Sequence, residues 1–215
     1  MYDFFFFVQI AALLVCIAFF KKMPHPYQYF APFLVLISIY ELGNILGWFK
    51  IDHNSIWSFN IYASAEFIYY SLLLHSLLTN PRDKSILFTA LITTLLITGI
   101  YNVLFTDFNS FNRYSYILQS FIIITACCRY FYYQINKAGE VTPITRQPAF
   151  WLNTGLLFYY LGSFLFFASY PFISNLGSTK FLILYRIVIN VSNITLYSCL
   201  IKLFLCFRQT KTSLA

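Results

Sequence analysis

Seven apolar stretches dominate this chain, and each is close to the roughly 20 residues that a helix needs to cross a bilayer. Short polar breaks separate them, such as KKMPHP at 21–26 and TNPRDKS at 79–85. In lipid, a continuous helix satisfies the backbone hydrogen bonds of such a stretch within the stretch itself. The sequence therefore predicts an all-α protein, a polytopic bundle of seven transmembrane helices in a single domain over residues 1–215. The expected spans are 3–20, 28–48, 57–78, 85–105, 114–134, 148–173 and 179–206.

The charges support the membrane class. Only 10% of the residues are charged, against about 25% in a typical soluble domain. The formal net charge is +7, but the basic residues sit in short breaks between apolar stretches, as they do in membrane proteins. No basic stripe with interleaved aromatic residues lies outside those stretches, so the pattern argues against nucleic acid as a partner.

The distribution of lysine and arginine predicts the orientation. Basic residues accumulate on the cytoplasmic side of membrane proteins, and here ten of them fall at one set of span ends and three at the other. The expected topology places the N-terminus outside and the C-terminus in the cytoplasm, in a multi-pass protein of the cytoplasmic (inner) membrane. MYDFFFFVQI lacks a basic region before its apolar run, which favours an uncleaved first helix. The richer set is Lys21, Lys22, Arg82, Lys84, Arg129, Lys137, Arg146, Lys202, Arg208 and Lys211; the other is Lys50, Arg113 and Lys180.

Three ionisable residues interrupt the predicted spans: Glu41, Glu66 and Arg186. Each costs on the order of 2.5–3.5 kcal/mol near the centre of a membrane helix, so such residues usually face the bundle interior and mark function. At about 1.5 Å per residue, all three lie at a similar depth in the outer half of the predicted bundle, together with Gln9 and Gln119.

Helical periodicity groups these residues with other polar side chains. Arg186, Asn190 and Asn193 follow one stripe of the last span, and Glu41 shares a face with Asn44. Stripes of this kind are expected to turn away from lipid. The sequence predicts a polar and aromatic ligand pocket that opens outward. Its candidate residues are Glu41, Asn44, Glu66, Tyr69, Gln119, Arg186, Asn190 and Asn193.

Within this pocket, Arg186 is predicted to pair with Glu41, with Glu66 or with both. Two carboxyls beside one guanidinium leave one of them undercompensated, and that group is expected to keep a proton. The alternative is a structural role, because buried ion pairs and asparagines also fix how membrane helices pack.

Other patterns indicate packing. The glycines Gly43 and Gly47, and Gly155 and Gly162, suit close contact between helices. Many tyrosines and tryptophans fall near span ends, where an interfacial belt is expected. The three histidines are scattered, and no metal-site, nucleophile or phosphate-loop motif occurs, so no metal and no cofactor are predicted.

Four segments carry a family resemblance: YFAPFLVLISIYELGNILGW, NIYASAEFIYYSLLL, RYSYILQSFIII and FWLNTGLLFYYLGSFLFF. They resemble a family of small, uncharacterised seven-transmembrane-helix membrane proteins of Bacteroidota. In its pattern a glutamate stands on the second helix, and N-x5-E-F on the third matches Asn60, Glu66 and Phe67 here. The resemblance implies the seven-helix fold and no activity.

Three functions remain open. The sequence favours a non-enzymatic membrane protein that binds a small or lipid-like ligand as a sensor or partner subunit; membrane lipids and a membrane or cytoplasmic partner protein are then expected around it. The second is an intramembrane enzyme acting on a lipid or isoprenoid, with Glu41 and Glu66 as acid and base. The third is a proton-coupled transporter, against which stands the lack of an evident internal repeat.

Overall fold

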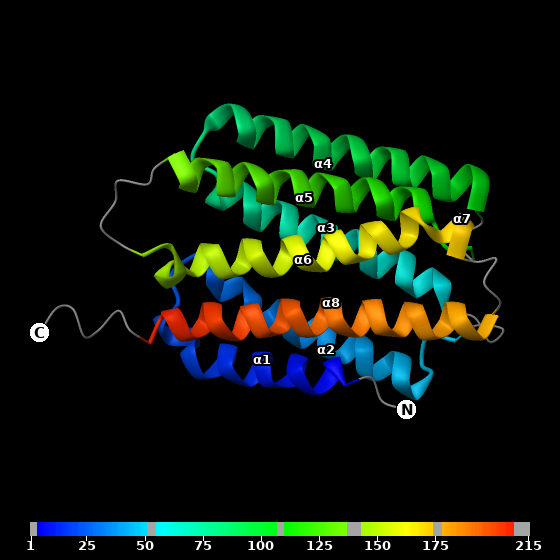
Figure 1. Ribbon diagram of the computed structural model, residues 1–215, viewed down its shortest axis with the longest axis horizontal. Coiled ribbons are helices and arrows are strands. Elements are labelled where there is room, and N and C mark those ends of the chain that lie inside the picture. Colours follow the sequence, from blue (N-terminus) through cyan, green and yellow to red (C-terminus); the bar gives the residue numbers. More distant parts are fainter. Residues whose placement is uncertain (1–3, 51–54, 107–109, 137–142, 174–177, 209–215) are drawn as a thin grey trace, which may run out of the picture.

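The computed structural model describes residues 4–50, 55–106, 110–136, 143–173 and 178–208, and its regular structure is helical throughout these ranges (Figure 1). Each predicted span contains one long helix. Shorter 3-10 turns lie at Phe20–Lys22, Tyr27–Tyr29 and Ile144–Arg146, and a π-helical turn at Asn102–Thr106 continues the fourth helix. The α-helices are α1 (Phe5–Phe19), α2 (Phe30–Leu46), α3 (Ile56–Leu77), α4 (Pro81–Tyr101), α5 (Arg113–Asn136), α6 (Pro148–Ala168), α7 (Tyr170–Ile173) and α8 (Ser178–Cys206).

The sixth predicted span is not one helix. It divides at Ser169 into α6 and the single turn α7. Pro171 lies in that turn, and proline inside a helix lacks a backbone donor and its ring clashes with the carbonyl four residues earlier, so α6 does not continue through it. At the starts of α4 and α6, Pro81 and Pro148 occupy the first helical position, where no donor is needed.

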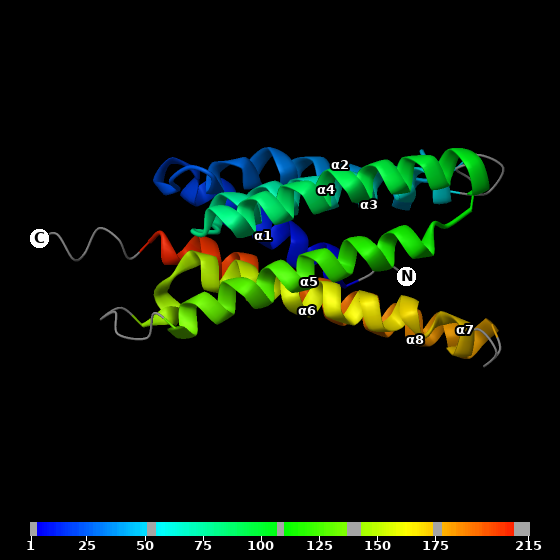
Figure 2. The same cartoon turned by 90° about the horizontal axis from the view of Figure 1, so that it is seen from above.

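The long helices run antiparallel to their sequence neighbours and form two layers. Figure 2 shows α2, α3 and α4 in one layer and α5, α6 and α8 in the other, with α1 between them. Helix α4 lies at the edge of the bundle, where it packs against α3 and α5. Because the number of long helices is odd, α1 begins at one end of the bundle and α8 finishes at the other (Figure 1).

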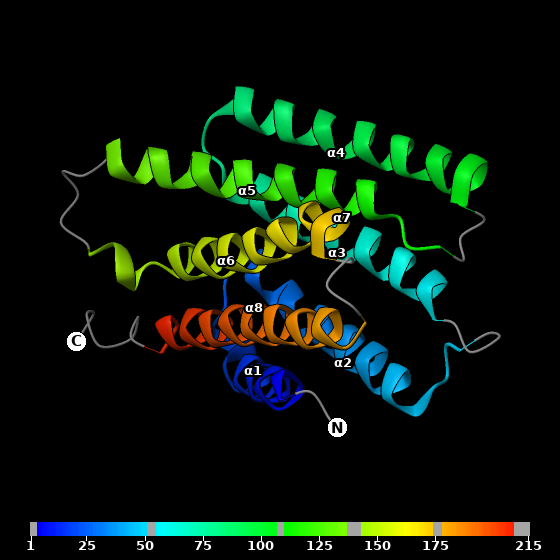
Figure 3. The same ribbon diagram turned by 45° about the vertical axis from the view of Figure 1, so that its right-hand side comes forward.

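Two glycines bring α6 and α8 together, in the most extensive helix contact of the fold (Figure 3). A Cβ added at Gly155 would lie 2.9 Å from the Cβ of Cys199 and 3.3 Å from Cδ1 of Leu196. A Cβ at Gly162 would collide with Ser192 on the same helix as these two residues. The prediction that Gly155 and Gly162 serve close helix contact is confirmed.

The same prediction is wrong for the glycines of α2. Gly47 ends the helix in the left-handed conformation, with φ of 76°, so it caps α2 and makes no helix contact. Gly43 makes room for the folded-back ring of Phe49. A G-x3-G spacing is therefore explained here by the turn at the end of the helix.

Aromatic rings fill the space between α2 and α3. The rings of Phe33 and Tyr69 stack with centroids 3.5 Å apart, and those of Tyr40 and Tyr62 stack at 4.3 Å. Rings of this size keep the two helix backbones apart while they still bury apolar surface. This spacing leaves room for polar groups toward one end of the bundle.

Within the described residues, five helical segments are long and apolar enough to cross a membrane: Phe5–Lys22, Tyr27–Leu46, Pro81–Leu104, Pro148–Ala168 and Lys180–Cys206. Helices α3 and α5 are as long but less apolar, because they carry buried polar side chains such as Asn60, Glu66, Gln119 and Ser120. These side chains lie inside the bundle. The lower hydropathy of α3 and α5 therefore reflects polar residues on their inward faces.

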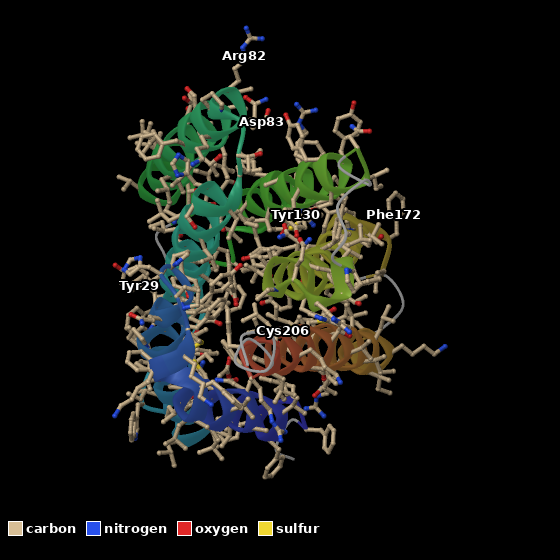
Figure 4. All side chains as sticks on the ribbon, turned by 90° about the vertical axis from the view of Figure 1, so that its left-hand side faces the viewer. Tyr29, Arg82, Asp83, Tyr130, Phe172 and Cys206 are labelled. Carbon is tan, nitrogen blue, oxygen red and sulfur yellow. The ribbon has the colours of Figure 1, made fainter. Side chains whose placement is uncertain are left out.

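The expected aromatic belt is only partly at the surface. Tyr29 and Tyr114 are more than half exposed, as an interfacial position requires. Tyr116 and Tyr130, by contrast, are buried. Figure 4, an end-on view, shows Tyr29 on the outside of α2 and Tyr130 between the helices. A position near a helix end therefore does not predict whether a tyrosine is exposed or buried in this protein.

Candidate functional site

A cavity of about 210 Å³ lies between α2, α3, α6 and α8, in the half of the bundle where α1 and α8 begin. Its walls combine charged and amide side chains with tyrosine and phenylalanine rings. At about 1.5 Å per residue, its lining residues reach roughly 9 Å into α2 and α3, 14 Å into α6 and 22 Å into α8 from the helix ends. The lining residues are Phe5, Tyr40, Glu41, Asn44, Phe59, Tyr62, Tyr116, Tyr159, Phe167, Tyr185, Arg186, Ile189, Asn190 and Asn193.

Two predicted polar stripes meet at this cavity. Glu41 and Asn44 reach it from α2, and Arg186, Asn190 and Asn193 reach it from α8. The spacings of three, four and seven residues place each group on a single helix face. The structure thus brings together five of the eight residues predicted for the pocket, although they come from opposite layers of the bundle.

The asparagines of α8 use their side-chain nitrogens in hydrogen bonds within the helix. The side-chain nitrogen of Asn190 donates to the backbone oxygen of Arg186 at 2.8 Å, and that of Asn193 donates to Ile189 at 2.9 Å. Oδ1 of Asn190 is buried and has no hydrogen-bond partner within the described part of the chain. A buried acceptor without a donor is costly, so this atom is suited to a ligand N–H or O–H group.

Glu66 lies behind the cavity wall. It is 3% exposed, and its Oε2 accepts a hydrogen bond from the hydroxyl of Tyr159 at 3.4 Å. Because Tyr159 itself lines the cavity, Glu66 is separated from the open space by that phenol ring. Six tyrosines from four helices lie within electrostatic range of its carboxyl: Tyr62, Tyr70, Tyr116, Tyr159, Tyr160 and Tyr197.

The two carboxyls that were predicted to pair with Arg186 have different surroundings in the structure. Arg186 and Glu41 share the cavity wall, whereas Glu66 is surrounded by phenol groups. An ion pair of Arg186 with either carboxyl, and the proton expected on one of them, stay predictions.

Tyr69 and Gln119 lie elsewhere. Tyr69 packs in the aromatic layer against Phe33. Gln119 is buried near a cluster of asparagines that joins α3, α4 and α5, beside a void of about 10 Å³. Both residues lie on the inward faces of their helices, as the periodicity indicates. At these two positions, however, the neighbours are not the residues that line the cavity.

The asparagine cluster is a structural clamp built from Asn60, Asn102 and Asn112. The side-chain nitrogen of Asn112 donates to Oδ1 of Asn102, and its own Oδ1 accepts from the backbone N–H of Ser115 at 3.0 Å, which caps the start of α5. The backbone N–H of Asn112 donates to Oδ1 of Asn60 at 3.3 Å. Three helices are therefore held together at the end nearest the cavity.

The sequence predicts an aromatic pocket, but it does not identify which rings line the cavity. Tyr116 and Tyr185 gave no distinguishing signal among 18 tyrosines. Tyr62 could have been predicted from the sequence, since it precedes Glu66 by four residues and shares its helix face. Tyr159 could not have been predicted, because its position depends on how α6 packs against α3.

The cavity combines charged, amide and aromatic groups. It offers one guanidinium, one carboxyl and several amide oxygens among aromatic rings, and no group of three or more potential metal ligands occurs among the described residues. No family model, curated protein or solved structure matches the chain. The chemistry of the site is thus argued from its own residues.

Proposed function

We propose that this protein crosses the cytoplasmic membrane seven times and binds a small ligand in the cavity between α2, α3, α6 and α8. It would act as a sensor or as a subunit of a larger membrane assembly. Support for seven crossings comes from α3 and α5, which lie alongside the apolar helices and turn their polar side chains inward. A bilayer-spanning bundle buries such groups between its helices, away from lipid.

Reporter fusions test the two less apolar crossings. Alkaline phosphatase should be active when fused after Lys50 or Ser110, because those positions precede α3 and α5 on the predicted outer side. A fluorescent protein should instead fluoresce after Asn80 or Asn136, on the cytoplasmic side. Equal reporter activity at both ends of α3 or of α5 would show that this helix does not cross.

The ligand is small and carries an anionic group. The cavity, at about 210 Å³, is below the roughly 300–1,000 Å³ of pockets for drug-sized molecules. Arg186 supplies a fixed positive charge, and the unpartnered oxygen of Asn190 calls for a donor on the same ligand. Tyrosine and phenylalanine rings favour an apolar or aromatic body between these polar ends. The observation that carries the proposal is the convergence of Arg186, Glu41 and Asn190 on one cavity.

Replacing Arg186 with glutamine should weaken ligand binding. Arg186 is exposed at the cavity wall, and exposed ion pairs are worth up to about 1 kcal/mol, so a molecule that copurifies with the wild type should fall up to about fivefold in occupancy. Native mass spectrometry of gently purified protein measures this. Arg113→Gln is the matched control, because Arg113 lies at the same end of the bundle but contacts Tyr114 and Tyr170 instead of the cavity.

The proposal fails if the wild type carries no bound molecule, or if Arg186→Gln and Arg113→Gln retain it equally. The same measurement addresses an enzymatic role, which the position of Glu41 in the cavity wall favours. Glu41→Gln in a binding protein changes the amount of ligand that is bound. In an enzyme it leads to accumulation of a different mass, because the substrate is no longer converted.

A further inference from the structure

A second open space lies on the opposite face of the fold, between α4 and α5. It measures about 300 Å³, and the walls are almost entirely apolar. Ile86 and Phe121, two of its lining residues, are 66% and 57% exposed. Helix α4 is at the edge of the bundle (Figure 1), so this groove faces outward and not into the interior.

The two charged residues of the groove are at one end. Asp83 begins the α4 wall and Arg129 belongs to the last part of the α5 wall, while the other lining side chains are apolar apart from Thr125. From Arg129 to Phe121 the wall extends about 12 Å, and from Asp83 to Ala90 about 10 Å. The groove is therefore polar at its head and apolar along its length.

Arg129 is held in place at this head. Its Nε and Nη2 atoms donate to the carboxylate of Asp83 at 3.3 and 3.2 Å, and Nη2 also donates to the hydroxyl of Tyr133. The Tyr133 hydroxyl in turn accepts from the side chain of Asn80 at 2.7 Å. These contacts leave Nη1 without an acceptor among the described residues, and the side chain remains 47% exposed.

The charge at the head favours an anion. Arg82 and Lys84 flank Asp83 in the sequence, in the first turn of α4, so three basic residues and one carboxylate occur at this end of the groove. Figure 4 shows Arg82 projecting outward from the end of α4 next to Asp83. Basic pockets between membrane helices on the cytoplasmic side suit the phosphate groups of lipids, and the positive-inside count places this end in the cytoplasm.

We infer that the groove between α4 and α5 binds one acyl chain of an anionic phospholipid, with the lipid phosphate at Arg129. The apolar walls take the chain, Nη1 of Arg129 donates to the phosphate, and Arg82 and Lys84 add attraction for the negative headgroup. The inference depends on α4 and α5 crossing the membrane, as proposed above. The groove and the ligand cavity share no lining residue, although Tyr116 of α5 also lines the cavity.

Native mass spectrometry of the full chain with defined lipids tests the site. The wild type should retain phosphatidylglycerol over phosphatidylcholine of the same acyl chains. Arg129→Gln should reduce that preference about five- to tenfold, as loss of one basic contact implies. Thr125→Trp fills the apolar wall and should displace both lipids. Arg113→Gln, which removes an arginine from the opposite end of α5, is the matched control and should change nothing.

Two additional measurements distinguish a lipid site from a local charge effect and from a free-phosphate site. Asp83→Asn combined with Arg129→Gln removes both charges of the ion pair together, so a loss of lipid preference there does not come from an unpaired carboxylate. Glycerol phosphate without acyl chains should fail to compete with phosphatidylglycerol. Equal retention of both lipids by the wild type, or unchanged retention in Thr125→Trp, would overturn the inference. If the ligand of the cavity persists in these variants, the proposed function stands independently.

Discussion

Leucine in place of Gly155 should lower the thermal stability of the protein by wedging α6 and α8 apart. Even a Cβ at this position would lie 2.9 Å from Cβ of Cys199 and 3.4 Å from the backbone oxygen of Leu196. The second of these contacts is with the backbone, which cannot turn aside as a side chain can. Leucine adds three more carbons, so the two helices must separate.

The expected loss of stability is that of an overpacked core. Extra carbons in a packed core cost about 1–3 kcal/mol, and each kcal/mol corresponds to about 2–4 °C for a chain of this length. At the upper end, the unfolding midpoint in detergent should fall by roughly 6–12 °C, measured by differential scanning fluorimetry. Gly155→Ala should show a smaller fall of the same sign.

Gly99 supplies the matched control. It lies in α4, and a Cβ built on it meets nothing within 4 Å. Gly99→Ala should leave the midpoint unchanged or raise it, because alanine is a better helix former by about 1 kcal/mol. Equal losses in Gly99→Leu and Gly155→Leu would mean that α6 and α8 are not packed as closely as the structure has them.

Alanine in place of Asn112 should weaken the clamp that joins α3, α4 and α5. The substitution removes the cap on the Ser115 N–H, worth about 1 kcal/mol, and the side-chain bond to Asn102, which averages about 0.6 kcal/mol between membrane helices. The sum, on the order of 2 kcal/mol, should appear as a lower unfolding midpoint and as faster proteolysis near the start of α5.

A pair of variants separates the two bonds. Asn112→Ser keeps a side-chain oxygen that can cap α5 but loses the bond to Asn102, so it should recover part of the loss. Asn136→Ala, at the exposed other end of the same helix, should have no effect. If Asn136→Ala and Asn112→Ala behave alike, the asparagine cluster contributes nothing specific to stability.

Much of the cavity could be foreseen from α2 and α8 taken separately. The stripes that contain Glu41 and Arg186 come from periodicity, since residues three, four and seven apart share a helix face. Charges in apolar helices also indicate inward faces. Both stripes do reach one cavity. Tyr69 shares a helix face with Glu66, and Gln119 falls at a similar depth, yet Tyr69 contacts Phe33 and Gln119 lies beside the asparagine cluster.

The glycines also show that a local sequence pattern does not predict which contact a residue makes. Gly155 and Gly162 on α6 and Gly43 and Gly47 on α2 are alike in the sequence, but only the first pair lies against another helix. The difference arises at the end of α2, where the chain turns at Gly47 and Phe49 folds back over Gly43. A local spacing describes one helix and cannot specify which partner, or which turn, the small residue accommodates.

The sequence by itself determined the number and approximate bounds of the long helices and which faces of α2 and α8 turn inward. It could do so because a helix satisfies its backbone hydrogen bonds locally, and its period of about 3.6 residues assigns each side chain to a face. Only the tertiary structure decided that Glu66 is enclosed by tyrosines and that Arg129 heads an apolar groove. Both arrangements depend on contacts between residues dozens of positions apart, and such contacts are set by the shapes and volumes that fit together when the helices pack.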